Sequence, residues 1–159
     1  MAGVGYVISN SAAVALSTSP KSILGIRAGA AFGIQLQQYE IGFNGVSASD
    51  GPVLVEICYC TFATNSTPGT NNTNENTNIR QHYGRVMASG MTAMSNWTSE
   101  PTVLTVLADF LLDPNKGLII YDYLLGQEPD TDLNHGFAIR CTAATGTPGA
   151  RARLKVERI

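Results

Sequence analysis

Two long apolar runs joined by a short turn constrain the fold of this chain more than any other feature. They occupy Thr102–Leu125, TVLTVLADFLLDPNKGLIIYDYLL. In the first run, one set of alternating residues carries a single charge, Asp109, and the other set carries none. Val, Thr, Ile, Phe and Tyr favour a pleated surface, and Pro114 and Gly117 provide turn chemistry between the runs. We therefore predict a hairpin, covered on both faces, at the centre of an all-β domain.

Further strands are predicted on both sides of this hairpin. In the strand Gly33–Phe43 the apolar residues change phase near Gln37, which indicates a β-bulge. The other predicted strands are Ser22–Ala28, Val53–Ala63, His82–Thr92, Gly136–Ala143 and Ala150–Ile159. About eight or nine strands, regularly spaced turn signals and no convincing helix predict an antiparallel β-sandwich. A jelly-roll-like sandwich is the first choice and an immunoglobulin-like sandwich the second.

Two stretches carry little apolar pattern. Residues Met1–Pro20 are small, and we expect an extended N-terminal arm, with a short strand at Ala13–Ser17, before a single sandwich domain at 21–159. Such an arm can fray or lie across a neighbouring subunit. Asn65–Asn78 is a low-complexity polar loop with too little apolar surface to offset the entropy of ordering it. We expect this loop to be dispensable for folding.

The composition bears on partners. Of the 159 residues 44% are hydrophobic and only 14% are charged, against roughly 25% charged in ordinary soluble domains. This balance predicts an oligomer with outer area buried between subunits, although a surface of Ser, Thr and Asn would also explain it. A net charge of −2 argues against nucleic-acid binding, and no run approaches the ~20 apolar residues of a membrane span. The start of the chain lacks signal-peptide features, so we expect a protein made and kept in the cytoplasm.

Three cysteines are the only candidates for redox or metal chemistry that the sequence marks strongly. Cys58 and Cys60 form a C-x-C pair, and Cys141 is remote. No histidine lies at ligand spacing, so buried free thiols are favoured over a metal site. The acids of the loop Gly126–His135 could bind calcium, but the loop lacks the pattern of an EF-hand, and a solvated loop is favoured.

Catalytic chemistry has no support in the sequence. Glu56 is a lone carboxylate inside an apolar strand, and pairing with Arg27 or Arg140 is favoured over a role as catalytic acid. The two histidines, His82 and His135, lie far apart, and no nucleophile elbow, phosphate-binding loop or zinc motif occurs. We expect no enzyme activity, no cofactor, no metal and no small-molecule substrate.

Three stretches of the chain carry a resemblance to a known family. They are FNGVSASDGPVLVEICYCTFATNSTPGTNNT, TSEPTVLTVLADFLLDPNKGLIIYDYLLGQEPD and GFAIRCTA. They resemble a family of small tailed-phage proteins that are encoded among phage head genes and act as capsid decoration, or cement, proteins. The resemblance extends from about Ser22 to the C-terminus. It implies a jelly-roll-like β-sandwich, a homotrimer located where capsomers meet on the outer surface of the virion, and the major capsid protein as partner.

Two other functions are compatible with such a sandwich. A carbohydrate- or receptor-binding module of a virion fibre should expose aromatic side chains on one face, and the candidates are Trp97, Tyr83 and Tyr123. An enzyme with a scattered site should bring ionisable residues together in one cleft.

The C-terminal strand Ala150–Ile159 provides the candidate contact with a capsid. Arg151, Arg153 and Lys155 alternate with apolar residues, and we call these three residues the basic stripe. The stripe is either the solvated face of an edge strand, where charge discourages unwanted pairing, or the surface that meets an acidic patch on the coat lattice. Changing all three residues to Glu is expected to leave folding largely intact, because the apolar face is unaltered.

Overall fold

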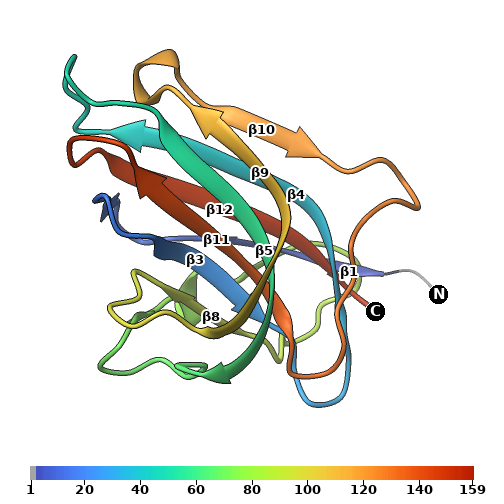
Figure 1. Cartoon of the computed structure of the whole chain (residues 1–159). Helices are drawn as coiled ribbons and strands as arrows, with labels where there is room; N and C mark the ends of the chain where they lie inside the picture. Colours follow the sequence, from blue (N-terminus) through green and yellow to red (C-terminus); the bar gives the residue numbers. More distant parts are fainter. Residues whose placement is uncertain (1–2) are drawn as a thin grey trace.

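Two antiparallel six-stranded sheets make up this protein, whose structure is a computed structural model that describes residues 3–159. Figure 1 shows the course of the strands. They are β1 (Val4–Ser9), β2 (Val14–Ala15), β3 (Lys21–Arg27), β4 (Ile34–Asn44), β5 (Val53–Thr64), β6 (Thr73–Asn74), β7 (Arg80–Tyr83), β8 (Thr92–Ser95), β9 (Thr102–Leu112), β10 (Ile119–Asp122), β11 (Gly136–Ala143) and β12 (Gly149–Arg158). Two single-turn 3₁₀ helices, η1 (Asn76–Asn78) and η2 (Pro114–Lys116), lie in connections.

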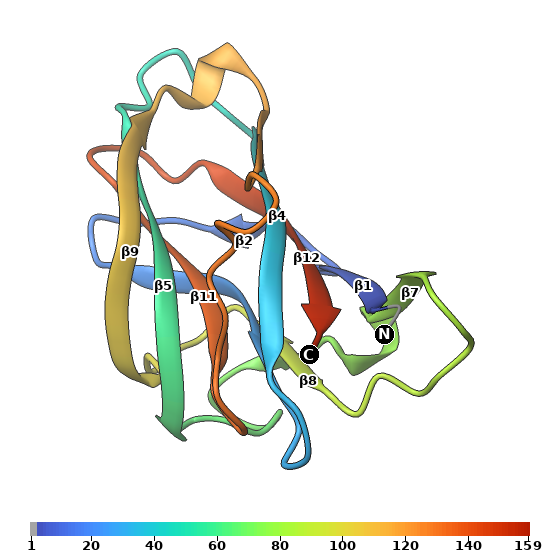
Figure 2. The same ribbon diagram turned by 90° about the vertical axis from the view of Figure 1, so that its right-hand side faces the viewer.

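Eight of these strands form the two main layers and define the fold. The first layer has the order β10-β4-β12-β1, and the second has the order β3-β11-β5-β9. Among these eight, each strand is followed along the chain by one in the opposite layer, except that β5 and β9 share a layer. Figure 2 shows the layers side by side, with β9, β5 and β11 in one and β4, β12 and β1 in the other. This topology is a jelly roll, so the predicted fold class is confirmed.

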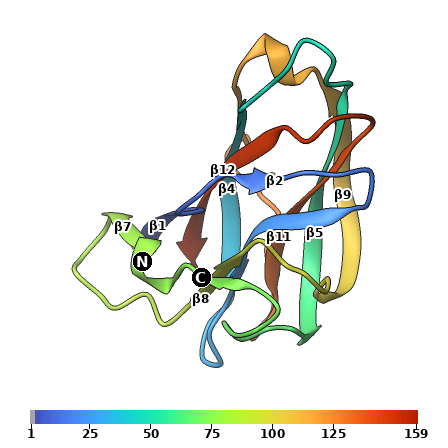
Figure 3. The same ribbon diagram turned by 90° about the vertical axis from the view of Figure 1, so that its left-hand side faces the viewer.

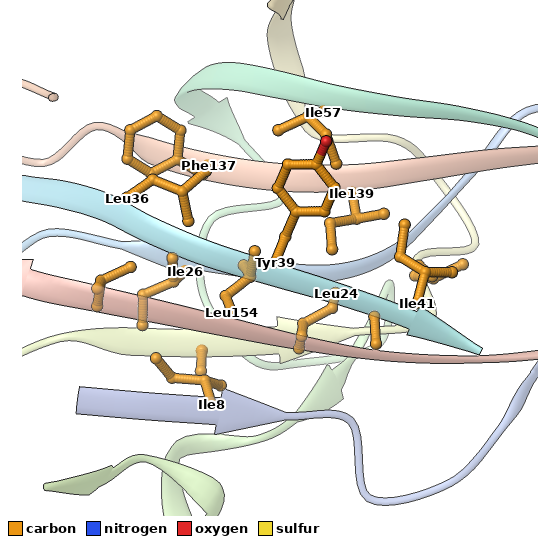
Figure 4. Close-up of a cluster of buried hydrophobic side chains, with 14 of the residues drawn as sticks. Ile8, Leu24, Ile26, Leu36, Tyr39, Ile41, Ile57, Phe137, Ile139 and Leu154 are labelled. Carbon is orange, nitrogen blue, oxygen red and sulfur yellow. The ribbon is translucent and has the colours of Figure 1, made fainter. Parts of the chain in front are cut away.

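The core lies between the layers and is mainly aliphatic, with a few aromatic rings. Ile57 and Ile139 project from one sheet toward Tyr39 and Leu154 of the other (Figure 4), and all four are buried. The predicted bulge is present in β4. Leu36 pairs with Val156 and Gln38 with Lys155, so Gln37 is the extra residue. It shifts the strand by one residue, and so Ile34 and Leu36 before it and Tyr39 and Ile41 after it all face the core.

A second, smaller apolar cluster contains the single tryptophan. Trp97 packs against Phe62, and the cluster also includes Cys60, Met94 and Ala138. Gly25 permits this contact, because a Cβ atom at that position would lie 2.8 Å from the Trp97 ring. The Trp97 indole N–H donates to the carbonyl oxygen of Asn65 at 3.0 Å, so the tryptophan also holds the start of the polar loop.

The central hairpin predicted at Thr102–Leu125 is wrong. The turn forms as expected, since Asp113 accepts from the Asn115 amide at 2.9 Å and Gly117 has a φ of 103°. However, β9 pairs with β5 and β10 pairs with β4, so the turn crosses from one sheet to the other. Both strands are the outermost of their sheets, and β9 is visible beyond β5 in Figure 3. A strand with apolar residues on both faces can be covered on both sides, or it can lie at the edge of a sheet with its apolar side chains exposed. The sequence pattern is the same in both cases.

Residues 3–20 do not form an arm outside the sandwich. β1 lies between β12 and β7, and its residues Tyr6 and Ile8 are fully buried. The short strand expected at Ala13–Ser17 is present as β2, which pairs with the first residues of β12. The segment is extended, as predicted, but it is an integral part of one sheet; Met1 and Ala2 lie outside the described residues.

The polar loop Asn65–Asn78 is also more structured than its composition suggests. Its end forms β6 and η1, and Glu75 between them is completely buried. The Glu75 carboxylate accepts hydrogen bonds from the amide and hydroxyl of Ser11, at 3.0 and 2.9 Å, and from the side chain of Asn78 at 2.6 Å. The hydroxyl of Ser95 donates to it as well. Glu75 therefore ties the loop to the connection after β1 and to β8.

Candidate interaction surfaces

The basic stripe lies on the outer face of the β10-β4-β12-β1 layer. Ala152 and Leu154 of β12 are buried, so Arg151, Arg153 and Lys155 point away from the core, as the alternation predicts. The prediction that β12 could be an edge strand is wrong, because β12 lies between β4 and β1. Charge on this face therefore does not serve to protect a free edge.

The three cations of the stripe differ in what holds them. Arg153 pairs with Glu40 on β4, whose carboxylate is nearly buried. The Arg151 guanidinium donates to the carbonyl oxygens of Asn10 and Ser11, at 3.1 and 2.8 Å. Within residues 3–159, no hydrogen bond or ion pair involves the Lys155 ammonium. Lys155 is thus the one cation of the stripe without a competing partner among the described residues, although its side chain is half-buried. Arg151 is exposed but held in place by its two hydrogen bonds.

A shallow hollow of about 310 Å³ opens beside the stripe. Its lining residues are Ser9, Asn10, Glu40, Gly42, Leu118, Arg151, Ala152 and Arg153. The Glu40 carboxylate in the wall of the hollow already forms an ion pair with Arg153. The hollow is therefore lined by this ion pair and by apolar side chains.

The second distinctive surface is apolar and lies where β9 and β10 end the two sheets. It comprises nine exposed large hydrophobic residues, which we call the apolar edge: Val103, Val106, Leu107, Leu111, Leu118, Ile120, Tyr121, Leu124 and Leu125. These are nine of the thirteen exposed large hydrophobics in the described chain, so the exposed apolar surface is concentrated at one margin of the sandwich. The sequence marked these residues as apolar but predicted that they would be covered.

Aromatic rings close the gap between the sheets beneath the apolar edge. Tyr39 of β4 stacks on Phe110 of β9, with ring centroids 6.1 Å apart, and on Tyr121 of β10 at 5.2 Å. Tyr123 meets Tyr121 edge-on at 5.1 Å. Burial, together with the neighbouring Tyr123 and Tyr121, raises the pKa of Tyr39 to about 12. The phenol stays neutral at physiological pH, and β9 and β10 are joined through their side chains although they share no sheet.

The residues considered for chemistry occupy structural positions. Glu56 forms a bidentate pair with Arg140, with N–O distances of 2.7 and 2.9 Å, so the predicted pairing is confirmed. Cys58, Cys60 and Cys141 are free and buried, as predicted. Burial raises the pKa of the Cys58 thiol to about 12 and that of Cys60 to about 11, so both are protonated at neutral pH.

The histidines and acidic residues were also candidates for a site. His135 hydrogen-bonds through Nδ1 to the Tyr59 hydroxyl, and the two rings meet edge-on. Among residues 3–159, no group of three or more His, Cys, Asp or Glu side chains is arranged to hold a metal ion. In the same part of the chain, no helix has the length and apolarity needed to span a membrane.

Comparison of this chain with protein-family models, curated proteins and solved structures gave no match.

Proposed function

We propose that this protein is a capsid decoration, or cement, protein that binds the outer surface of a phage head as a homotrimer and stabilises the shell. The observation that carries the proposal is the location of the cations and of the exposed apolar side chains. The space between the sheets is filled by aliphatic and aromatic side chains, whereas the cations and the exposed apolar residues lie on outer surfaces. Such a molecule is suited to binding other macromolecules by its faces.

The jelly roll and the resemblance to phage decoration proteins support the same function. Jelly rolls occur in viral capsid proteins, although they also occur in lectins and enzymes, so the fold alone does not decide the role. The major capsid protein is the proposed partner, and the basic stripe is the proposed contact surface. A surface cation such as Arg151 gives orientation and association rate when it faces an acidic surface, and the half-buried Lys155 has no competing partner among residues 3–159.

A direct test is to mix the purified protein with undecorated capsids and measure co-sedimentation at increasing salt concentration. Attachment should weaken with salt, because exposed charges are screened beyond ~10 Å at 0.1 M ionic strength. Copy number relative to coat protein should be fixed at saturation. Binding that is absent, or that does not saturate, would refute the decoration role.

A charge variant tests the basic stripe itself. Arg153 should be left in place, because Arg153→Glu would set a second carboxylate against the nearly buried Glu40 and destabilise the sheet. The expectation that a triple change to Glu leaves folding intact is therefore withdrawn. Arg151→Gln with Lys155→Gln removes two charges and should lower capsid affinity at least tenfold.

A matched control for this variant removes two charges elsewhere on the surface. Arg80→Gln with Arg85→Gln changes exposed residues of β7 and the loop that follows it. The control should bind like the unmodified protein. Equal binding by both double variants would show that the stripe is not the contact surface.

The alternative function, a carbohydrate- or receptor-binding module of a virion fibre, has less support. Of its three candidate aromatics, Trp97 is buried and Tyr123 is half-buried. Tyr83 is at the surface, but its hydroxyl donates to Glu157 at 2.7 Å and accepts from Gln37 at 2.6 Å. A glycan array distinguishes the two functions, because specific sugar binding without capsid binding would favour the fibre module.

A further inference from the structure

We infer that the apolar edge is the surface through which copies of this chain assemble, the β9 side of one copy packing against the β10 side of the next. The β9 side consists of Val103, Val106, Leu107 and Leu111, and the β10 side consists of Leu118, Ile120, Tyr121, Leu124 and Leu125. The inference rests on the proposed function only for the number of copies, which is three.

The first argument is the amount of exposed apolar surface. The nine side chains of the apolar edge expose roughly 900 Å² between them, whereas the largest apolar patch of a typical monomer is about 300–600 Å². A specific protein–protein interface buries about 800 Å² on each partner. In the proposed contact the β9 side of one copy meets the β10 side of the next, so the nine side chains supply roughly 900 Å² of apolar area to one interface in total. A standard interface of about 1,600 Å², of which about 56–65% is non-polar, contains a similar apolar area.

The second argument is that the backbone is unpaired at the same place. β9 pairs only with β5, and β10 pairs only with β4, so each presents a free edge of N–H and C=O groups. Long edge strands are usually protected by Lys, Pro or inward-pointing charges. β9 carries a bulge at Leu107 and one charge, Asp109, and the five residues from Ala108 to Leu112 pair regularly with β5. This segment is a regular, unprotected strand edge in which Asp109 is the single charged residue.

The third argument identifies the occupant as a second copy rather than a coat protein. On a free single chain, an exposed apolar area of this size would promote aggregation unless something covers it. A newly made chain always has other copies of itself available as partners. Interfaces of obligate oligomers are also more apolar than interfaces formed between preformed molecules. The apolar edge therefore fits an interface between copies, whereas the charged basic stripe fits contact with a preformed partner.

The fourth argument concerns geometry. The two sides of the apolar edge belong to different sheets, and the stacked rings of Phe110, Tyr39 and Tyr121 hold them in a fixed relation. A contact between unlike sides is heterologous, and such contacts produce closed rings when the rotation between copies closes. Leu118 of the β10 side lines the same hollow as Arg151 and Arg153, so the ring would border this end of the basic stripe.

The test uses purified full-length protein in the absence of capsids, so its failure is separate from a failure of capsid binding. Sedimentation equilibrium at micromolar concentration should give three chains of 16.8 kDa. Leu107→Glu with Leu111→Glu damages the β9 side, and Leu118→Glu with Leu125→Glu damages the β10 side. Each double variant should sediment as a single chain. Val86→Glu with Leu133→Glu, which changes two exposed apolar residues outside the apolar edge, should stay trimeric.

Mixing the two edge variants tests the pairing of unlike sides. Each retains one intact side, so the mixture should form a complex of two chains although neither variant associates alone. A monomeric unmodified protein, trimeric edge variants or failure of the mixture to associate would each overturn the inference. Circular dichroism confirms folding of each variant. If a double variant does not fold, a single change replaces it, Leu125→Glu on the β10 side or Leu111→Glu on the β9 side. These side chains are 97% and 67% exposed, and each change should still weaken association at least tenfold.

Discussion

Glu75 is the residue whose role is least apparent from its surroundings in the sequence. It is the only charged residue in the polar loop, and it is fully buried with four donor groups directed at its carboxylate. Hydrogen bonds to a charged group contribute about 1.5–3 kcal/mol each when measured by deletion. A lone acid in a run of Asn and Thr was the one signal that could have identified it.

We predict that Glu75→Gln lowers the free energy of unfolding by about 2–4 kcal/mol, because an amide presents one donor group to a site made of donors. Urea denaturation measures the change. The control is Asp132→Asn, which neutralises an exposed acid and should change stability by less than about 0.5 kcal/mol. An equal effect of both substitutions would mean that Glu75 contributes only through net charge.

The buried cysteines predict a pH dependence. Burial raises the pKa of Cys58 and Cys60 from 9.0 to about 12 and about 11, so above pH 9 the unfolded chain releases thiol protons that the folded chain retains. The thiols' contribution to stability is then complete below pH 9 and is lost as pH rises through 11 to 12. Each pKa unit corresponds to about 1.4 kcal/mol.

The measurement is urea denaturation between pH 8 and pH 11. Stability should fall above pH 9, and Cys58→Ala should reduce that slope. The phenol of Tyr39, whose pKa is about 12, contributes in the same direction and should leave a residual slope in the variant. Stability that is constant to pH 11 would contradict the prediction.

Among the connections, the polar loop has two parts, which we expect to differ in how well they tolerate replacement. Thr67, Gly69 and Thr70 at its tip are exposed, whereas Asn71 and Glu75 form side-chain hydrogen bonds. We predict that replacing 67–70 by Gly-Ser residues costs less than about 1 kcal/mol, because the loop length and so its closure entropy are unchanged and the replaced residues are mostly exposed.

Replacing 71–78 by a linker of the same length should cost at least about 3 kcal/mol, because it removes β6 and the buried Glu75. Thermal unfolding of the two variants provides the comparison. Equal melting temperatures would show that the loop is dispensable throughout, as its composition alone suggested.

For the assembled protein, self-association predicts a stability that depends on concentration. Binding of folded copies to one another stabilises the folded state by mass action, so the melting temperature should rise by several degrees between about 1 and 100 μM chain. The Leu107→Glu, Leu111→Glu variant should melt at one temperature throughout this range. A melting temperature of the unmodified protein that is independent of concentration would indicate a monomer.

Several features of the fold were predictable because they depend on local alternation. The strands at Lys21–Arg27, Ile34–Asn44 and Val53–Thr64 follow from residues that alternate in polarity or carry β-branched side chains, and the bulge at Gln37 follows from a change of phase. Of the proposed contact residues, Arg151, Arg153 and Lys155 were placed on one face correctly by the same alternation. The Glu56–Arg140 pair followed from the cost of burying a lone carboxylate.

The pairing of strands depends on contacts between residues far apart in the chain, and here local pattern was not sufficient. β9 and β10 are adjacent in sequence and suited to a hairpin, yet they pair with β5 and β4 in different sheets. β1, although weakly patterned, is an interior strand between β12 and β7, and its side chains Tyr6 and Ile8 belong to the core. The amino-acid sequence therefore determined which segments are extended and which face of each is apolar, since these are set by neighbouring side chains. Only the tertiary structure decided which apolar faces are covered, because coverage depends on the segment that packs against them.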